Sequence, residues 1–223
     1  TGDERYLAGA RAAGMRLVAL AEEIPGGGVR WQGTCERNEA LIPEGDRVGL
    51  YDGNAGIGLF LMHLAEAARE DRFRKLAQAA FERVLREART EAGGCHWEYS
   101  FQDVIGGEAG IGLALLEMHR LTRDERWLEA ARDAARWLVG KASRQKDGLA
   151  WSPYDAADAS FSHGTSGIGF FLMSLPGAEA RKASLAAARW VEAAAVPAGK
   201  AGRLWAYYAG DPPEGKQNWV MNS

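Results

Sequence analysis

The chain has 223 residues, enough for one or two domains with a buried core, and its 27 basic and 30 acidic residues leave a net charge of −3. Acidic and basic residues are interspersed, which disfavours binding to nucleic acid or to an anionic membrane. The apolar runs are far shorter than the roughly 20 residues of a membrane span, and no secretory signal opens the chain. Cys35 and Cys95 are the only cysteines, so we expect no disulfide framework and a cytoplasmic protein.

Helical periodicity dominates the chain from its N-terminus. The first predicted element is a helix over about residues 4–24. A glycine-rich helix then follows Gly53, with apolar or small residues at i, i+3, i+4, i+7 and i+8, and a second helix rich in Arg and Glu ends near Gly93. The same pair of helices is predicted after Gly107 and after Gly164. The last helix should run over about residues 178–195. Seven helices are therefore expected, with strand character only in short pieces.

Two motifs recur at a shared period. The frame Gly-x-Ala/Ser-Gly-Ile-Gly begins at Gly53, Gly107 and Gly164, which are 54 and 57 residues apart. A second frame, Gly-x-x-Trp, occupies residues 28–31, 94–97, 148–151 and 202–205. Such a pattern indicates a repeat architecture in which each repeat is a helical hairpin.

Stacked hairpins can remain an open solenoid or close into a ring. The small residues at each first helix favour the ring, because they let several helix ends approach one axis. We therefore predict an all-α protein with the α/α-toroid fold. The amides and the positive dipole ends of these helices are expected to face one pole, where they could stabilise developing negative charge.

The fourth repeat begins but does not continue. Trp205 completes the fourth Gly-x-x-Trp, yet no fourth glycine frame follows before Ser223. We interpret residues 1–223 as the N-terminal part of a single toroid domain, with residues 202–223 as the start of a repeat that is cut off. The exposed apolar faces of such an arc would be covered by the remainder of the toroid or by self-association.

Three blocks of sequence carry a family resemblance. They are GLYDGNAGIGLFL at Gly49, FQDVIGGEAGIG at Phe101 and FSHGTSGIG at Phe161. In this order they resemble the lanthionine synthetase C-like family of lanthipeptide cyclases, most closely the cyclase portion of class II lanthionine synthetases. The resemblance implies an α/α toroid that adds cysteine thiols of a dehydrated precursor peptide to dehydroalanine or dehydrobutyrine, closing thioether (lanthionine) rings.

The resemblance also implies roles for individual residues. The family's histidine and aspartate correspond to His163 and Asp103, which would do acid/base work. The complete family enzyme is expected to hold Zn²⁺ through two cysteines and a histidine, and a metal-bound thiol is deprotonated. The motifs that carry those ligands are not present here, so the resemblance assigns no metal ligand to this chain.

Other polar residues have simpler interpretations. Cys95 and His96 fill the variable positions of a Gly-x-x-Trp turn, where another repeat has Leu and Ala. Cys35 is predicted in an irregular polar loop. His63 and His119 lie within their helices, away from the glycine frames, and Asp52 is expected to act as a helix cap.

Two further functions stay open at this point. One is a zinc-free, non-catalytic relative that binds peptide or a thiol compound. The other is an α/α-toroid glycosidase, in which Asp103 and Glu108 would be the acid and the base. Such carboxylates must face each other about 5 to 10 Å apart across a cavity, which a sequence does not reveal.

Overall fold

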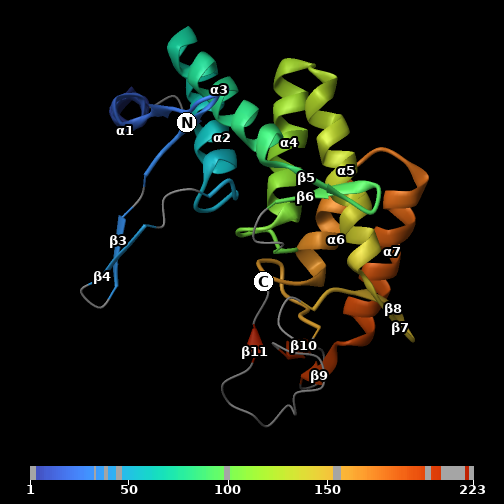
Figure 1. The fold of residues 1–223 in the computed structure, drawn as a ribbon. Helices are drawn as coiled ribbons and strands as arrows, with labels where there is room; N and C mark the ends of the chain where they lie inside the picture. The colour runs from blue at the N-terminus through green and yellow to red at the C-terminus, as the bar shows by residue number, and fades with distance from the viewer. Residues whose placement is uncertain are drawn as a thin grey trace. The chain divides into compact units, whose positions relative to one another are not determined.

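The computed structural model describes residues 4–32, 34–37, 40–43, 47–97, 101–152, 157–198, 202–206 and 219–220. The helices within these ranges are α1 (Glu4–Leu20), α2 (Asn54–Ala68), α3 (Asp71–Glu87), α4 (Glu108–Thr122), α5 (Glu125–Lys141), α6 (Thr165–Ser174) and α7 (Ala178–Ala193) (Figure 1). The all-α prediction and the helical hairpins are thereby confirmed.

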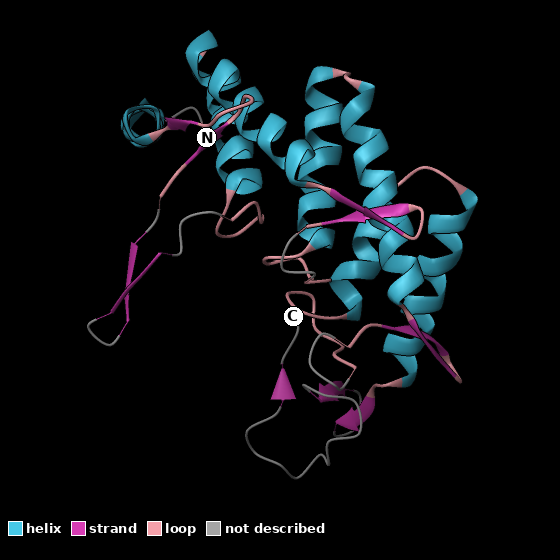
Figure 2. Cartoon of the chain, in the orientation of Figure 1, coloured by secondary structure: helices cyan, strands magenta, loops and turns pink. Residues whose placement is uncertain are grey.

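Short antiparallel ribbons connect the helices (Figure 2). Their strands are β1 (Glu22–Glu23), β2 (Val29–Arg30), β3 (Thr34–Arg37), β4 (Ala40–Pro43), β5 (Arg89–Glu91), β6 (Gly94–His96), β7 (Ser143–Gln145), β8 (Gly148–Ala150), β9 (Val196–Ala198), β10 (Gly202–Ala206) and β11 (Trp219–Val220). Each strand is too short to show a clear alternation in sequence.

Four local predictions need correction. Helix α3 ends at Glu87 rather than near Gly93, because the chain enters strand β5 at Arg89. The first helix ends at Leu20 rather than near residue 24, because Glu22–Glu23 form strand β1. This strand pairs with β2 across a turn in which Gly26, Gly27 and Gly28 all have positive φ. The last helix ends at Ala193, where the chain turns toward β9. Cys35 lies in strand β3, where it pairs with Ile42 of β4, and not in an irregular loop.

The described chain divides into two compact units. The N-terminal unit (Thr1–Ala88) contains α1 and the α2–α3 hairpin. Its core lies between α2 and α3, where Leu61, Met62, Phe73 and Phe81 are completely buried. The other charged residues of α3 are at least partly exposed, as expected for an amphipathic outer helix, but Arg83 is buried and donates to Asn54.

The C-terminal unit (Arg89–Ser223) contains two hairpins, α4–α5 and α6–α7, of which α4 and α6 contact each other. Its core is built from side chains that are at most 2% exposed: Ile111, Leu115, Trp127, Leu138 and Phe171. A Cβ on Gly112 of α4 would overlap the ring of Phe171 in α6. Glycine at this position therefore lets the two inner helices pack closely.

The Gly-x-x-Trp frames link one outer helix to the next. A Cβ on Gly148 in β8 would overlap the carbonyl oxygen of Ala186, so this strand packs directly against α7. Three residues later, the Trp151 indole donates a hydrogen bond of 2.8 Å to the Leu138 carbonyl near the end of α5. In the N-terminal unit the Trp31 indole donates in the same way to the end of α1. The motif is thus a structural connector between successive hairpins.

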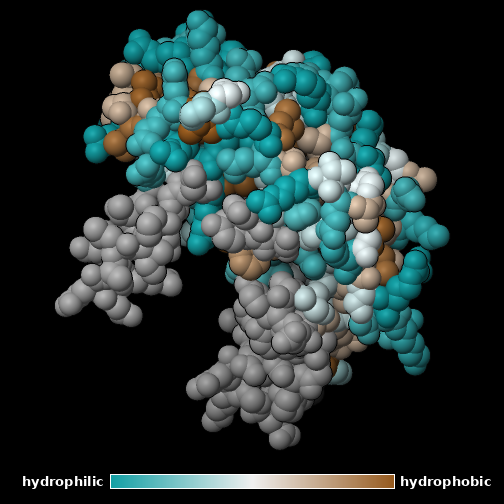
Figure 3. Space-filling view, viewed as in Figure 1, coloured by the Kyte–Doolittle hydropathy of each residue, from teal (hydrophilic) through white to brown (hydrophobic). Residues whose placement is uncertain are grey.

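The described helices include none that is long and apolar enough to cross a membrane. The space-filling view shows a mainly hydrophilic surface over α7, at the right of Figure 3. This agrees with the exposed charged residues of the outer helices.

Candidate active site

The loop before each glycine frame runs along the first turn of the following helix. In the α4 repeat, the Glu108 amide donates to the Phe101 carbonyl at 2.9 Å and the Gly110 amide donates to the Asp103 carbonyl at 3.2 Å. In the α6 repeat, the Thr165 amide donates to the Asp158 carbonyl at 2.7 Å. The same backbone register therefore recurs in both repeats.

This register corrects the expected anion site at the helix starts. The Glu108, Gly110 and Thr165 amides bind carbonyl oxygens of their own loops, so they are not available to a negative charge on a ligand. The close approach of the loop also explains why the first residue of the motif is glycine. A Cβ on Gly107 or Gly164 would overlap the loop carbonyl of Phe101 or Asp158, respectively. These glycines leave room for the backbone of the preceding loop. We therefore look for reactive groups among the side chains.

Asp103 joins the two loops of the C-terminal unit. Its side chain is 5% exposed. One carboxylate oxygen, Oδ1, accepts the Gly106 amide at 3.0 Å and closes its own loop. The other, Oδ2, lies 2.7 Å from Nδ1 of His163, which is distant in sequence. A backbone bond from the Val104 amide to the Ser162 carbonyl, 3.1 Å long, runs beside this contact.

His163 is held by its own loop as well. Oδ1 of Asp158 accepts the Ser160 amide at 2.6 Å, and the Ser160 hydroxyl accepts the His163 amide at 3.2 Å. Asp158 and Ser160 are almost fully buried, whereas the His163 side chain is 36% exposed. The backbone is therefore fixed while the imidazole stays accessible.

The Asp103–His163 contact defines the chemistry available here. A carboxylate only accepts hydrogen bonds, so Nδ1 of His163 is the donor in this pair. Nε2 is then the nitrogen that can accept or release a proton, and Asp103 holds the ring in that orientation. This is the arrangement of a general acid/base with a positioning carboxylate.

Two exposed aromatic side chains belong to the His163 loop and to helix α6, which follows it: Phe161 and Phe170. The rings of Phe161 and Phe170 are tilted against each other with centroids 5.6 Å apart, and both side chains are more than two-fifths exposed. Such exposed aromatic residues offer an apolar contact surface.

Glu108, the first residue of α4, is a buried carboxyl group near Asp103. It is 1% exposed, and its Oε1 accepts the Trp97 amide at 3.2 Å. Its Oε2 is buried without a hydrogen-bond partner among the described residues. Burial, reinforced by the negative charge of Asp103, raises the pKa of Glu108 to about 8. Glu108 is therefore mainly protonated at neutral pH.

The remaining candidates lie apart from this pair. Burial raises the pKa of the Cys95 thiol to about 12, and Sγ points to the Ala130 carbonyl at 3.7 Å. His96 stacks on Trp137 with ring centroids 5.1 Å apart. No group of three or more His, Cys, Asp or Glu residues with metal-binding geometry occurs in the described part of the chain.

Asp52, His63 and His119 also have ordinary surroundings. Asp52 pairs with Arg47 of its own loop instead of capping α2, whose N-cap Gly53 has no side-chain cap. His63 is exposed on α2. His119 Nδ1 lies 3.1 Å from the Asp124 carbonyl near the end of α4.

Sequence reasoning paired Asp103 with His163 through the family resemblance, and the structure brings them into contact. It missed Asp158 and Ser160, for which the only signal was two small polar residues shortly before His163. It named Glu108 only as a possible glycosidase carboxylate. The other repeats have Asn54 and Thr165 at this position, so a carboxyl there was the available signal.

Residues 89–191 match the sequence model of the family described as lanthionine synthetase C-like protein. Over these residues the chain is similar to the lanthionine synthetase C-like family. The match contains Asp103, Glu108 and His163, and therefore the whole of the site described above. No curated protein matches the chain in sequence.

A solved structure supports the fold independently. The chain is similar to the crystal structure of a family 76 glycoside hydrolase from a bovine Bacteroides thetaiotaomicron strain, with a TM-score of 0.64 and 16% sequence identity. The similarity covers 90% of this chain and 44% of that one. It confirms an α/α-toroid type of fold. The chain spans less than half the length of that structure.

Proposed function

We propose that this chain carries the acid/base pair of a lanthipeptide cyclase-like enzyme. The observation that supports this most directly is the hydrogen bond between His163 Nδ1 and Asp103 Oδ2, at 2.7 Å, within the lanthionine synthetase C-like segment. The accessible imidazole and the exposed pair Phe161–Phe170, in the same loop and the following helix, fit a site for an apolar stretch of peptide.

The reaction is an addition of a peptide cysteine to a dehydroamino acid. The thiol gives up its proton, sulfur forms a bond to the β-carbon of dehydroalanine or dehydrobutyrine, and the electrons of the carbon–carbon double bond move toward the carbonyl. The α-carbon then takes up a proton, so the sum is the transfer of one proton from sulfur to carbon. We assign that proton delivery to Nε2 of His163, while Asp103 keeps the ring oriented.

The expected zinc ion does not fit the described side chains. Cys95 is buried, with its pKa raised to about 12, and the described residues contain no suitable cluster of ligands. We therefore propose that the zinc ligands of a complete enzyme lie outside the described residues. Metal analysis of the purified chain checks this. One zinc per chain, lost in Cys95→Ser, would overturn it.

The glycosidase alternative is not favoured by the geometry. Asp103 and Glu108 are both at least 95% buried and belong to the same loop–helix junction. A glycosidase needs two carboxyl groups that reach opposite sides of a bound sugar. The other alternative, that the protein is a zinc-free, non-catalytic relative, is tested by the activity assay below.

We further propose a dehydrated, cysteine-containing precursor peptide as the partner and the cytoplasm as the location. The remainder of the toroid, or a second copy of the chain, would complete the ring. The proposals for the partner and the location follow from the proposed reaction.

The test uses the complete protein and a peptide that contains one dehydroalanine and one cysteine. Ring closure is followed by mass spectrometry after alkylation of unreacted thiols. We expect His163→Asn to slow ring closure by about 10² to 10⁴ fold, the usual effect of removing a general acid/base. His119→Asn is the matched control and should leave the rate unchanged. Equal rates for wild type and His163→Asn, or no ring closure by the wild type, would refute the proposal.

A further inference from the structure

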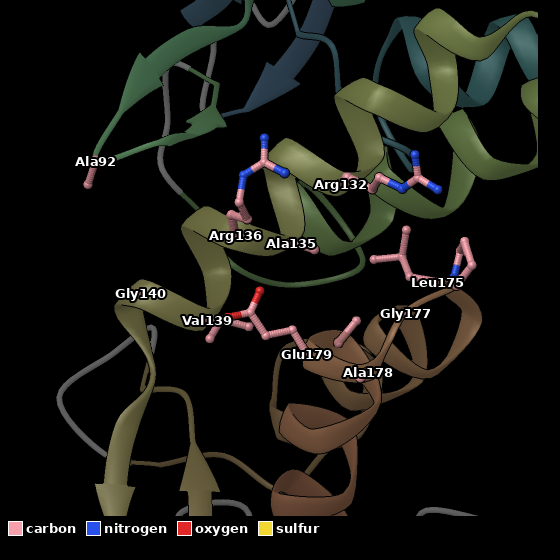
Figure 4. A pocket seen from close by; sticks show the side chains of 12 residues that line it. Ala92, Arg132, Ala135, Arg136, Val139, Gly140, Leu175, Gly177, Ala178 and Glu179 are labelled. Atoms are coloured by element: carbon pink, nitrogen blue, oxygen red, sulfur yellow. The ribbon is translucent and has the colours of Figure 1, made fainter.

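A second surface of the C-terminal unit lies between the outer helices α5 and α7. A groove of about 560 Å³ is lined by α5 and by the corner between α6 and α7. Figure 4 shows Arg132 and Arg136 projecting from α5, Glu179 from the first turn of α7, and Leu175 from the corner. A second groove, of about 710 Å³, lies between the β7–β8 ribbon and α7. Val139 and Glu179 line both, so the two grooves are continuous.

The rim of this joint groove is rich in positive charge. Besides Arg136, which pairs with Asp133, it carries five cations that are exposed and have no salt-bridge partner among the described residues: Arg132, Arg144, Lys146, Lys182 and Arg189. Its acidic residues are Asp147 and Glu179. This excess contrasts with the chain as a whole, whose net charge is −3.

The floor of the groove is apolar and built from small residues. It includes Ala135, Val139, Ala180, Ala183 and Ala186. Small side chains let another backbone approach closely, and the long Arg and Lys side chains can place their charges on both sides of it. The lining contains no aromatic residue, so nucleic-acid bases would find no stacking partner.

We propose that this groove binds a peptide segment that combines acidic with apolar side chains. The cations of α5, α7 and the β7–β8 ribbon pair with its carboxylates, and its apolar side chains contact the alanine-lined floor. The groove is distinct from the Asp103–His163 pair, and the proposal does not depend on the reaction proposed for that pair.

The test measures binding directly, without any chemistry. The probe is a short fluorescein-labelled peptide in which glutamate and leucine alternate, titrated with the chain by fluorescence anisotropy at low and at physiological salt. We expect affinity to fall as salt rises. The double variant Lys182→Glu with Arg189→Glu should weaken binding by about tenfold, because two attractive contacts become repulsive.

Two matched controls make the result decisive. Arg120→Glu with Arg126→Glu alters the net charge equally but lies outside the groove lining, and it should retain wild-type affinity. The same peptide with glutamine in place of glutamate should bind far more weakly. Absence of binding, an equal loss in both double variants, or displacement of the probe by an equal concentration of oligothymidylate would overturn the proposal. The His163→Asn variant should bind the probe normally, which separates this proposal from the proposed reaction.

Discussion

The loops that precede α2 and α6 have equivalent backbone hydrogen bonds but different side chains next to the helix. The Asn54 amide donates to the Arg47 carbonyl, as the Thr165 amide donates to the Asp158 carbonyl. At the position before the motif glycine, however, the first loop has Asp52, paired with Arg47 of the same loop, whereas the second has His163, paired with Asp103 from another repeat. The backbone frame is thus shared, and the chemistry depends on which side chains it presents.

The residue after the motif glycine extends this comparison. Asn54 is buried and satisfied: its amide group donates to the Val29 carbonyl at 2.7 Å and its oxygen accepts from Arg83 at 3.2 Å. Glu108, at the same position in the next repeat, leaves one oxygen without a partner among the described residues. One repeat therefore has a neutral structural amide where the next has a titratable group.

The largest predicted effect comes from the Glu108 proton. In the unfolded chain this carboxyl ionises near pH 4.5, whereas in the folded chain its pKa is about 8. The folded state thus binds more protons at Glu108 than the unfolded state between these values, so the contribution of this group to stability is fully present below about pH 4.5 and is lost as the pH rises to about 8. The loss from this group is at most about 5 kcal/mol, since the pKa difference is about 3.5 units and each unit corresponds to about 1.4 kcal/mol.

Urea unfolding between about pH 5 and pH 8 measures this slope. Glu108→Gln should remove most of it, because glutamine keeps an oxygen for the Trp97 amide and does not ionise. Glu129→Gln, at an exposed position of α5, should retain the wild-type slope. Identical slopes in wild type and Glu108→Gln would show that Glu108 is ionised in the folded protein.

The next largest effect is expected from removing the carboxylate that pairs with His163. Asp103→Asn should slow ring closure in the complete protein by about 100-fold, because the carboxylate that holds His163 is lost. Asp52→Asn, the equivalent loss in the first loop, should leave the rate unchanged. ¹⁵N NMR of His163 provides a readout apart from activity, since the Nδ1-protonated tautomer should be populated less in Asp103→Asn. Equal rates in the two variants would contradict the distinction between the loops.

A smaller effect is expected from the shared backbone frame itself. Gly164→Ala should lower the unfolding free energy by about 2 kcal/mol, because the added methyl group overlaps the Asp158 carbonyl and the loop must shift. Gly9→Ala, within α1 where a Cβ meets nothing within 4 Å, should instead raise it by about 0.5 to 1 kcal/mol. Thermal or urea unfolding of both variants is sufficient, and a tolerated Gly164→Ala would contradict the close-approach explanation.

The smallest effect is expected for the Arg47–Asp52 ion pair. Both side chains are at least 30% exposed, so water and salt weaken their attraction. Asp52→Asn should change the unfolding free energy by less than about 0.5 kcal/mol, and added salt should reduce even that difference. A loss several times larger would mean that the first loop depends on its side chains as much as the second.

Helical periodicity predicted the hairpins well because each helix has several turns over which an apolar face can be counted. The ribbons were predicted poorly: strands such as β6 and β8 have three residues each, which is too few to show alternation. The β3–β4 pairing around Cys35 was missed for the same reason. Strands β6 and β8 instead pack against helices that follow them in the chain, α5 and α7, respectively.

The site was predictable only in part. The chemical types of His163 and Asp103 were visible in the sequence, but their contact joins residues that are 60 positions apart and no local pattern specifies it. The amides at the helix starts were expected to face a ligand, but those of Glu108 and Thr165 bind the carbonyls of Phe101 and Asp158, in loops whose path the sequence does not reveal. Glu108 resembled an ordinary acidic residue in a first helical turn, and only its burial distinguishes it.

The Gly-x-x-Trp connector has a consequence for how the chain acquires its structure during synthesis. Gly148 packs against α7, which follows it, while Trp151 binds the end of α5, which precedes it. The ribbon that closes one repeat is therefore completed only when the next outer helix has emerged from the ribosome. Folding should propagate from each hairpin to its neighbour through such nearest-neighbour contacts, and each new repeat should lock the one before it.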